Sequence, residues 1–199
     1  MFSGLVAYGG RIHEIERDAR GGMRLVVACE GVERERPEVK DSIAIDGVCL
    51  TATEVSGERI TFDVIPETIE RSTLGARTQG ERVNVEYSLR VGDRMGGHFV
   101  YAHVDARARV IARTPEGQGE RMRIERPARI AEGIVEKGYV AVDGVSLTVA
   151  ATGPDWFELA LIPETLRRTT LGVRPVGSEV NLEIDPLARY VAAALGARR

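Results

Sequence analysis

The chain of 199 residues repeats itself at a fixed distance. Shifted by 97 positions, residues 46–86 lie over residues 143–183 without a gap, and 18 of these 41 positions are identical. The identities form blocks, among them DGV, IPET and TLG. Solenoid repeats have periods of about 20–50 residues, whereas a period of this length is the size of a small domain. The repeat therefore predicts two successive domains of one fold, with a boundary near Gly97.

Each copy is dominated by β-strand patterns. RVNVEYSL (82–89) and EVNLEID (179–185) alternate apolar and polar residues, which is the period of a half-buried strand. RLVVAC, SIAIDGVCLTATEV and RITFDVI are further β-branched runs, separated by turns that contain glycine. About six short strands per copy predict a closed antiparallel barrel, because closure leaves no exposed strand edge. We therefore expect an all-β protein of two tandem six-stranded barrels.

Three segments have helical signals. IPETIERSTLG (65–75) and IPETLRRTTLG (162–172) each place proline at a first turn and glycine at the end. In the tail, Asp185 can cap a helix with one apolar face, formed by Leu187, Tyr190, Val191, Ala194 and Leu195. This face packs either on its own barrel or against the same helix of a neighbouring chain, and we favour the neighbour.

Charge and cysteine content exclude several classes. The formal charge is −3, and the sequence has no basic stripe. Both observations argue against nucleic acids and anionic membranes as partners. Cys29 and Cys49 cannot build a disulfide framework, and neither a signal peptide nor a membrane-spanning stretch is evident. We expect a cytoplasmic protein with two free thiols. The terminal residues Arg198 and Arg199 are expected to be solvated.

A small polar pair recurs at one position of both copies. Cys49 and Thr51 are two residues apart on a predicted strand and so share a face, as do Ser146 and Thr148. Such a pair can hydrogen-bond the edge of a heteroaromatic ligand, although it can also be a satisfied polar pair at a barrel mouth. The threonines of the two IPET motifs could face the same clefts.

The segment GGHFVYAH (96–103) holds two of the three histidines. We expect no metal site, because His98, His103 and Cys49 lack metal-ligand spacing. Phosphate-loop, dinucleotide and nucleophile-elbow motifs are absent from the sequence. Packing in the core or at an interface is the plainer interpretation of both histidines, and His13 is given no role.

Together these motifs resemble riboflavin synthase of the alpha-chain type. The resemblance covers essentially the whole chain and depends on MFSGLV, DGVCLT, GGHFVYAHVD, KGYVAVDGVSLTV, LIPETLRRTTLG and VNLEIDPLARYV. It implies two six-stranded Greek-key barrels and a C-terminal helix through which three chains associate. The implied domains are residues 1–97, 98–185 and 186–199, the last being the trimerisation helix.

The implied activity is a transfer of a four-carbon unit between two molecules of 6,7-dimethyl-8-ribityllumazine. The products are riboflavin and 5-amino-6-(ribitylamino)uracil, and members of the family need no metal or organic cofactor. The resemblance also implies that each site lies between the first barrel of one chain and the second barrel of a neighbour. Association with a lumazine synthase capsid, which some members show, stays open. The alternatives are a non-enzymatic lumazine- or flavin-binding protein of the same fold and a structural double barrel.

The resemblance also implies two groups of substrate-binding residues. The first-barrel site is lined by Gly4, Leu5, Val6, Cys49, Leu50, Thr51, Asp63, Val64, Ile65, Pro66, Glu67 and Thr68. The second-barrel site is lined by Ala102, His103, Val104, Lys137, Ser146, Leu147, Thr148, Ala160, Leu161, Ile162, Pro163, Glu164 and Thr165. Candidates for the chemistry are Cys49, Ser146, His103 and Phe2. Many relatives have glycine at Ala102 and a small polar residue or glutamine at Tyr101.

Overall fold

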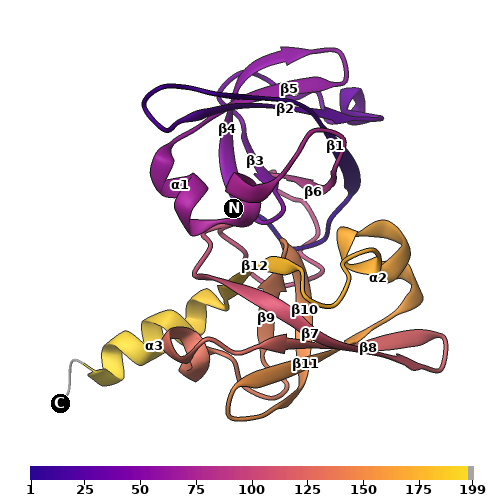
Figure 1. The fold of residues 1–199 in the computed structure, drawn as a ribbon, viewed down its shortest axis with the longest axis vertical. Helices are drawn as coiled ribbons and strands as arrows, with labels where there is room; N and C mark the ends of the chain where they lie inside the picture. Colours follow the sequence, from indigo (N-terminus) through magenta and orange to yellow (C-terminus); the bar gives the residue numbers. More distant parts are fainter. Residues whose placement is uncertain (197–199) are drawn as a thin grey trace.

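The computed structural model describes residues 1–196 and shows two closed, six-stranded antiparallel barrels stacked along the longest axis (Figure 1). The first barrel has the strand order β1-β2-β5-β4-β3-β6 and the second β10-β11-β8-β7-β12-β9. The first six strands are β1 (Tyr8–Arg17), β2 (Met23–Cys29), β3 (Ser42–Ile45), β4 (Val48–Ser56), β5 (Arg59–Val64) and β6 (Arg82–Tyr87). The second six are β7 (Ala106–Glu116), β8 (Gly119–Glu125), β9 (Tyr139–Val142), β10 (Val145–Thr152), β11 (Trp156–Leu161) and β12 (Glu179–Ile184). The predicted all-β tandem fold is confirmed.

Each barrel has its own apolar core. The first core surrounds Phe62 and the second surrounds Phe157, and both rings are fully buried. Leu50 and Leu147, from the predicted site motifs, point into these cores. Their neighbours at 49, 51, 146 and 148 are more exposed, as the strand alternation predicts.

The IPET segments form shorter helices than the sequence predicts. α1 (Pro66–Arg71) and α2 (Pro163–Arg168) are each followed by a 3-10 turn, η2 (Thr73–Ala76) and η4 (Thr170–Gly172). Ser72 separates α1 from η2, because its hydroxyl donates to the carbonyl of Thr68 and accepts from the amide of Leu74. Such a side chain competes with the helical backbone and ends the α-helix before Gly75. The other 3-10 turns are η1 (Val32–Arg34) and η3 (Ala128–Gly133).

The C-terminal helix α3 (Pro186–Gly196) extends away from the second barrel (Figure 1). Asp185 caps it by accepting a hydrogen bond from the amide of Leu187, at 2.9 Å. The apolar side chains of Leu187, Tyr190, Val191 and Leu195 are all exposed. Packing of this face on its own barrel is therefore not what this chain shows. The end of the predicted helix, including Arg198 and Arg199, lies outside the described residues.

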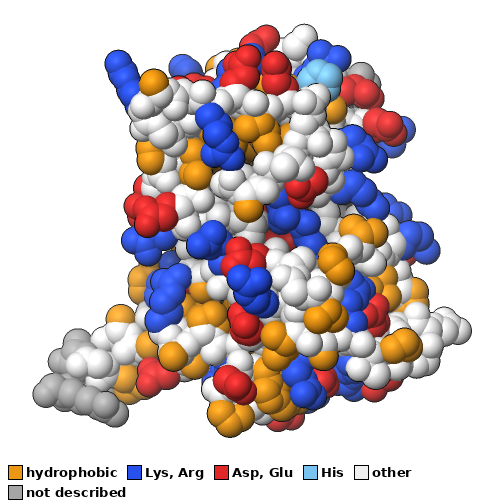
Figure 2. Space-filling view, viewed as in Figure 1, with side chains coloured by type: hydrophobic (Ala, Val, Ile, Leu, Met, Phe, Trp, Pro, Cys, Tyr) orange, Lys and Arg blue, Asp and Glu red, His pale blue; other side chains and the backbone are white. Residues whose placement is uncertain are grey.

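The surface mixes charges of both signs. Figure 2 shows Lys and Arg side chains interspersed with Asp and Glu over the face that it presents. Within residues 1–196, no helix combines the length and apolar character needed to cross a bilayer. Among the side chains that the structure describes, no group of three or more His, Cys, Asp or Glu is placed to hold a metal ion.

A symmetric hydrogen-bond network joins the two barrels. The amide group of Asn84 donates to the carbonyl of Asp143 and accepts from the backbone amide of Thr170, each at 2.8 Å. Asn181, its counterpart in the repeat, makes the same two bonds back to the first barrel. Each asparagine thus satisfies buried backbone groups of the opposite barrel, which fixes the two barrels in one relative orientation.

Four charged side chains are buried beside this network. Arg174 contacts Asp46 at 2.9 Å and Asp143 at 3.0 Å, and Arg77 contacts Asp46 at 3.0 Å. Both aspartates are fully buried. Burial, and then the proximity of Asp143, raise the pKa of Asp46 to about 6. The arginines from the two TLGxR segments therefore compensate two carboxylates that could not be buried alone.

Candidate ligand-binding sites

The segments that precede the two barrels cross over and dock on the opposite barrel. They pair with each other where the amide of Phe2 donates to the carbonyl of Val100 and the amide of Val100 donates to that of Phe2. Beyond this bridge, the amide of Ser146 donates to the carbonyl of Gly4, and the amide of Cys49 donates to that of Ala102, both at 2.8 Å. Each barrel thus carries, beside its Cys or Ser, a segment that belongs to the other half of the repeat.

The packing of the next residues follows the same exchange. Val6 packs against the core of the second barrel, and Val104 packs against the core of the first. The predicted grouping of these segments is therefore wrong. The resemblance implies that residues 4–6 belong to the first-barrel site and that Ala102, His103 and Val104 belong to the second. In the structure, residues 4–6 lie on the second barrel, and Ala102, His103 and Val104 lie on the first. The reason is the Phe2–Val100 bridge, which directs each segment away from its own barrel.

The pocket on the first barrel forms around Cys49. It has a volume of about 160 Å³, and its lining includes Thr68 and Glu67 from α1 and Ala102, His103 and Val104 from the crossing segment. Burial raises the pKa of the Cys49 thiol, so the group is a neutral, weakly polar wall rather than a ready thiolate. His103 is exposed and lies at the rim.

Ala102 has a left-handed backbone with φ of 57°. Its counterpart Gly4 has φ of 75°, so both crossing segments make the same turn. A side chain is disfavoured in this region of backbone space, which costs about 1–2 kcal/mol. The methyl group of Ala102 is buried against Phe2, Ala44 and Val100, which offsets part of that cost.

Ser146 holds the position in the second barrel that Cys49 holds in the first, and its side chain has a histidine partner. His98 Nδ1 lies 2.7 Å from Ser146 Oγ, and the histidine ring stacks on Tyr139. Burial lowers the pKa of His98, which favours the neutral imidazole. A neutral imidazole can accept the proton of the Ser146 hydroxyl or donate to its oxygen. Among the described residues, no histidine is hydrogen-bonded to the Cys49 side chain. Cys49 and Ser146 therefore differ in hydrogen-bond partner as well as in atom type.

The other predicted residues are divided between several places. Lys137 is exposed, with φ of 64°, and its amide donates to the carbonyl of Val149. Val64 and Leu161 are core residues, whereas Ala160, Ile162, Pro163 and Glu164 are exposed. Phe2 is fully buried between the barrels. Its backbone joins the two crossing segments through Val100, and its predicted part in the chemistry stays a prediction.

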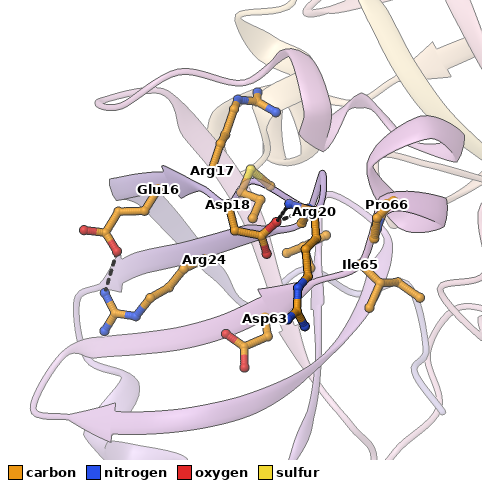
Figure 3. Close-up of a pocket in the computed structure, with 11 residues that line it drawn as sticks. Glu16, Arg17, Asp18, Arg20, Arg24, Asp63, Ile65 and Pro66 are labelled. Carbon is orange, nitrogen blue, oxygen red and sulfur yellow. Dashed lines mark hydrogen bonds and ion pairs between the residues drawn. The ribbon is translucent and has the colours of Figure 1, made fainter.

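Part of the 63–68 segment faces a second hollow on the first barrel. Figure 3 shows Asp63, Ile65 and Pro66 there, with Arg20 between Asp63 and Ile65 and with Arg24 directed toward Glu16. The hollow has a volume of about 440 Å³. Arg24 is already paired with acidic side chains of the same sheet. The charges in this hollow are balanced, so we assign no separate ligand to it.

Three features of the sites escaped the sequence analysis. Lys40 is the counterpart of Lys137 at the repeat offset, has φ of 81°, and donates its amide to Ala52 in the same way. His98 is the partner of Ser146. Glu86 and Glu183, buried at the ends of β6 and β12, hold the crossing segments. The repeat offset was the available signal for the lysine and glutamate pairs.

Comparison with known proteins agrees with this geometry. A family model described as the lumazine binding domain matches residues 3–88 and, a second time, residues 101–185. The riboflavin synthase of Mycobacterium tuberculosis (strain H37Rv) is 45% identical over 202 residues, with 96% of each chain covered. The chain belongs to the riboflavin synthase family. The riboflavin synthase of Bacillus subtilis (strain 168) is 34% identical, with 96% of this chain and 88% of the relative covered.

Solved structures show the same double barrel. LumP complexed with riboflavin matches with a TM-score of 0.85 at 25% identity, over 92% of this chain and 99% of LumP. LumP complexed with 6,7-dimethyl-8-(1'-D-ribityl) lumazine matches with a TM-score of 0.82 at 24% identity, over 92% of this chain and 98% of LumP. The resemblance to the riboflavin synthase family, drawn from sequence motifs, is confirmed.

Glu183 gives the stability of this family member a dependence on pH. Burial raises the pKa of its carboxyl group from 4.5 to about 7, so between these values the folded chain holds a proton that the unfolded chain has lost. The free energy of unfolding should therefore fall as pH rises through this window, by up to about 3 kcal/mol. Denaturant titrations from pH 5 to 8 should show that the free energy of unfolding of Glu183→Gln increases relative to that of the parent chain as pH rises. Parallel curves for the two proteins would contradict this assignment, and Glu179→Gln, at a half-buried position of the same strand, is the comparison variant.

Proposed function

We propose that the chain is a riboflavin synthase that converts two molecules of 6,7-dimethyl-8-ribityllumazine into riboflavin and 5-amino-6-(ribitylamino)uracil. The observation that carries the proposal is that Cys49 and Ser146 hold the same position in the two barrels, each with its amide bonded to a crossing segment, in a chain similar to curated riboflavin synthases over almost its full length. A reaction between two identical molecules needs two sites for one ligand, which an internal repeat supplies.

In this proposal the enzyme is a transferase of a four-carbon unit, and its main contribution is to position the two ligands. Holding two reactants in a fixed orientation replaces an encounter in solution, which is worth effective concentrations of about 10⁵–10⁸ M in favourable cases. The reaction also needs a proton removed from a methyl group and a nucleophile added to an imine carbon. The groups that we expect to accept or donate protons are His103 at the Cys49 pocket and the Ser146–His98 pair on the second barrel.

The two sites play different roles, donor and acceptor, so their walls must differ. The difference at Cys49 and Ser146 is the chemical asymmetry that the repeat retains. The hydroxyl of Ser146, joined to a neutral imidazole, is a stronger hydrogen-bonding group than the Cys49 thiol.

We also propose that the enzyme acts as a homotrimer in the cytoplasm. Support comes from the exposed apolar face of α3, which a neighbouring chain would cover, and from the two free cysteines. In the trimer, the first barrel of one chain would face the second barrel of its neighbour, and α3 would be the trimerisation helix. Association with a lumazine synthase capsid is a further possibility of this proposal. Sedimentation at the mass of a single chain, with full activity, would contradict the trimer.

The function is tested by mixing the purified full chain with 6,7-dimethyl-8-ribityllumazine, without added cofactor, and following the visible absorbance of riboflavin. We expect riboflavin to form, and Ser146→Ala to slow its formation about 10–100-fold through loss of one oriented hydrogen bond. Cys49→Ser, which keeps a small polar group, should have a smaller effect. A stable bound fluorophore without turnover would favour a non-enzymatic lumazine- or flavin-binding protein, and unchanged rates in both variants would overturn the assignment of the two sites.

A further inference from the structure

Two buried glutamates hold the segments that complete the two ligand sites. Glu86, at the end of β6 in the first barrel, accepts hydrogen bonds from the amide and hydroxyl of Ser3 at 2.8 and 2.9 Å. It also accepts from the amide of Gly4, at 3.2 Å to one oxygen and 3.1 Å to the other. Glu183, its counterpart on β12, accepts from the amide of Tyr101 at 2.8 Å and from the amide of His103 at 3.0 Å, one to each carboxylate oxygen.

Burying the two carboxylates that hold these segments costs free energy. Glu86 and Glu183 are only 6% and 3% exposed, and among residues 1–196 neither forms an ion pair with Lys, Arg or His. Burial raises the pKa of both carboxyl groups, which measures the cost of desolvation. These buried carboxylates are compensated by the backbone amides of the crossing segments and, at Glu86, also by the hydroxyl of Ser3.

Each glutamate acts on the site of the opposite barrel. Glu183 belongs to the second barrel, but its segment carries Ala102, whose carbonyl accepts from the amide of Cys49 in the first barrel. Glu86 belongs to the first barrel, and its segment carries Gly4, whose carbonyl accepts from the amide of Ser146 in the second. In both cases two hydrogen bonds connect the carboxylate to the site, one from the crossing segment to the carboxylate and one from the opposite barrel to the crossing segment.

From this geometry we infer that Glu183 and Glu86 are positioning residues, each of which fixes the ligand site on the barrel opposite to its own. Glu183 sets the place of Ala102 and His103 at the Cys49 pocket, and Glu86 sets that of Gly4 at Ser146. The inference deepens the proposed function and rests on it for the identity of the ligand, but the crossed arrangement can be tested without any ligand.

The test uses Cys49 as a reporter of its own pocket. Glutamine in place of Glu183 keeps the shape but offers an NH₂ group to one of the two amides, so one hydrogen bond is lost. The segment should then open more often and hydrate the Cys49 thiol. We expect Glu183→Gln to increase the rate of Cys49 alkylation by iodoacetamide about tenfold, as the loss of one hydrogen bond to a charged group predicts. Peptide mapping by mass spectrometry separates Cys49 from the buried Cys29.

Two variants make the comparison specific. Glu86→Gln should leave the Cys49 rate at the parent value, although Glu86 lies in the same barrel as Cys49. Glu179→Gln removes a charge from the same strand as Glu183, away from the crossing segment, and should also leave the rate unchanged. In the Cys49→Ser, Ser146→Cys background, the pattern should reverse, with Glu86→Gln increasing the alkylation rate at position 146 and Glu183→Gln leaving it unchanged.

The outcomes separate this inference from the proposed function. Equal acceleration at both positions by either glutamate variant indicates general loosening and overturns the crossed arrangement, as does no acceleration. If the crossed pattern holds but the parent chain does not convert lumazine, the positioning stands and the proposed function fails. If lumazine is converted and the crossed pattern is absent, the function stands and the positioning roles fail.

A measurement on the unmodified protein covers the case in which a glutamine variant does not fold. The amides of Ser3, Gly4, Tyr101 and His103 should exchange slowly with deuterated water, because each is bonded to a buried carboxylate. Phe99, an exposed residue in the same stretch, should exchange quickly. Exchange of the four amides as fast as that of Phe99 would overturn the inference.

Discussion

Gly144→Ala is expected to destabilise the protein by about 2–5 kcal/mol, the sum of backbone strain and overpacking. Gly144 has φ of 79°, and a Cβ atom there would lie 2.8 Å from the backbone nitrogen of Gly47 in the other barrel. The reverse also holds, since a Cβ at Gly47 would lie 2.5 Å from the nitrogen of Gly144. The DGV turns of the two copies therefore touch backbone to backbone, which only glycine allows.

Thermal or denaturant unfolding of Gly144→Ala measures this effect. Gly177→Ala is the matched control, because Gly177 has φ of 91° but no atom within 4 Å of its would-be Cβ. The control isolates the backbone strain, which is about 1–2 kcal/mol. If both variants lost the same stability, the close approach of the two barrels would contribute nothing and this account of their contact would be wrong.

Asp46→Ala is expected to cost about 3–5 kcal/mol, because it removes one partner of a buried ionic cluster. Arg77 and Arg174 would then share a single buried carboxylate, that of Asp143. The backbone amide of Asn84, which donates to Asp46 at 2.8 Å, would lose its acceptor as well. The loss should separate the barrels before it unfolds either one, since each barrel has its own core.

Equilibrium unfolding in urea tests this prediction. Glu16→Ala serves as the comparison, because Glu16 contacts Arg24 at 3.9 Å on the exposed surface and such pairs contribute about 0–1 kcal/mol. A loss below about 1 kcal/mol for Asp46→Ala would mean that the buried cluster is not needed to hold the barrels together.

The barrels could be predicted from the sequence because their signal is local and repeated. Strand alternation and the offset between the DGV blocks indicate how many strands there are and that two copies exist. The division of the IPET helices at Ser72 could not be predicted, since it depends on a hydroxyl that bonds the backbone on both sides.

The crossing of the leading segments was also out of reach of the sequence. Aligning Phe2 with Val100 shows that the two segments are equivalent, but it does not show on which barrel each one docks. That choice depends on long-range pairing, in which Phe2 and Val100 bond each other and Gly4 and Ala102 reach strands far along the chain. Glu86 and Glu183 are identical at the repeat offset, and this identity was the available sign of a shared role.

We propose that one chain provides two binding sites for a single kind of ligand, and that two bound molecules react with each other. Quantifying all species after complete reaction of 6,7-dimethyl-8-ribityllumazine with the full chain tests it most directly. We expect two molecules of 6,7-dimethyl-8-ribityllumazine to be consumed for every riboflavin formed, with one 5-amino-6-(ribitylamino)uracil released. Riboflavin formed from one lumazine at a time, or one lumazine held unchanged by each chain, would contradict it.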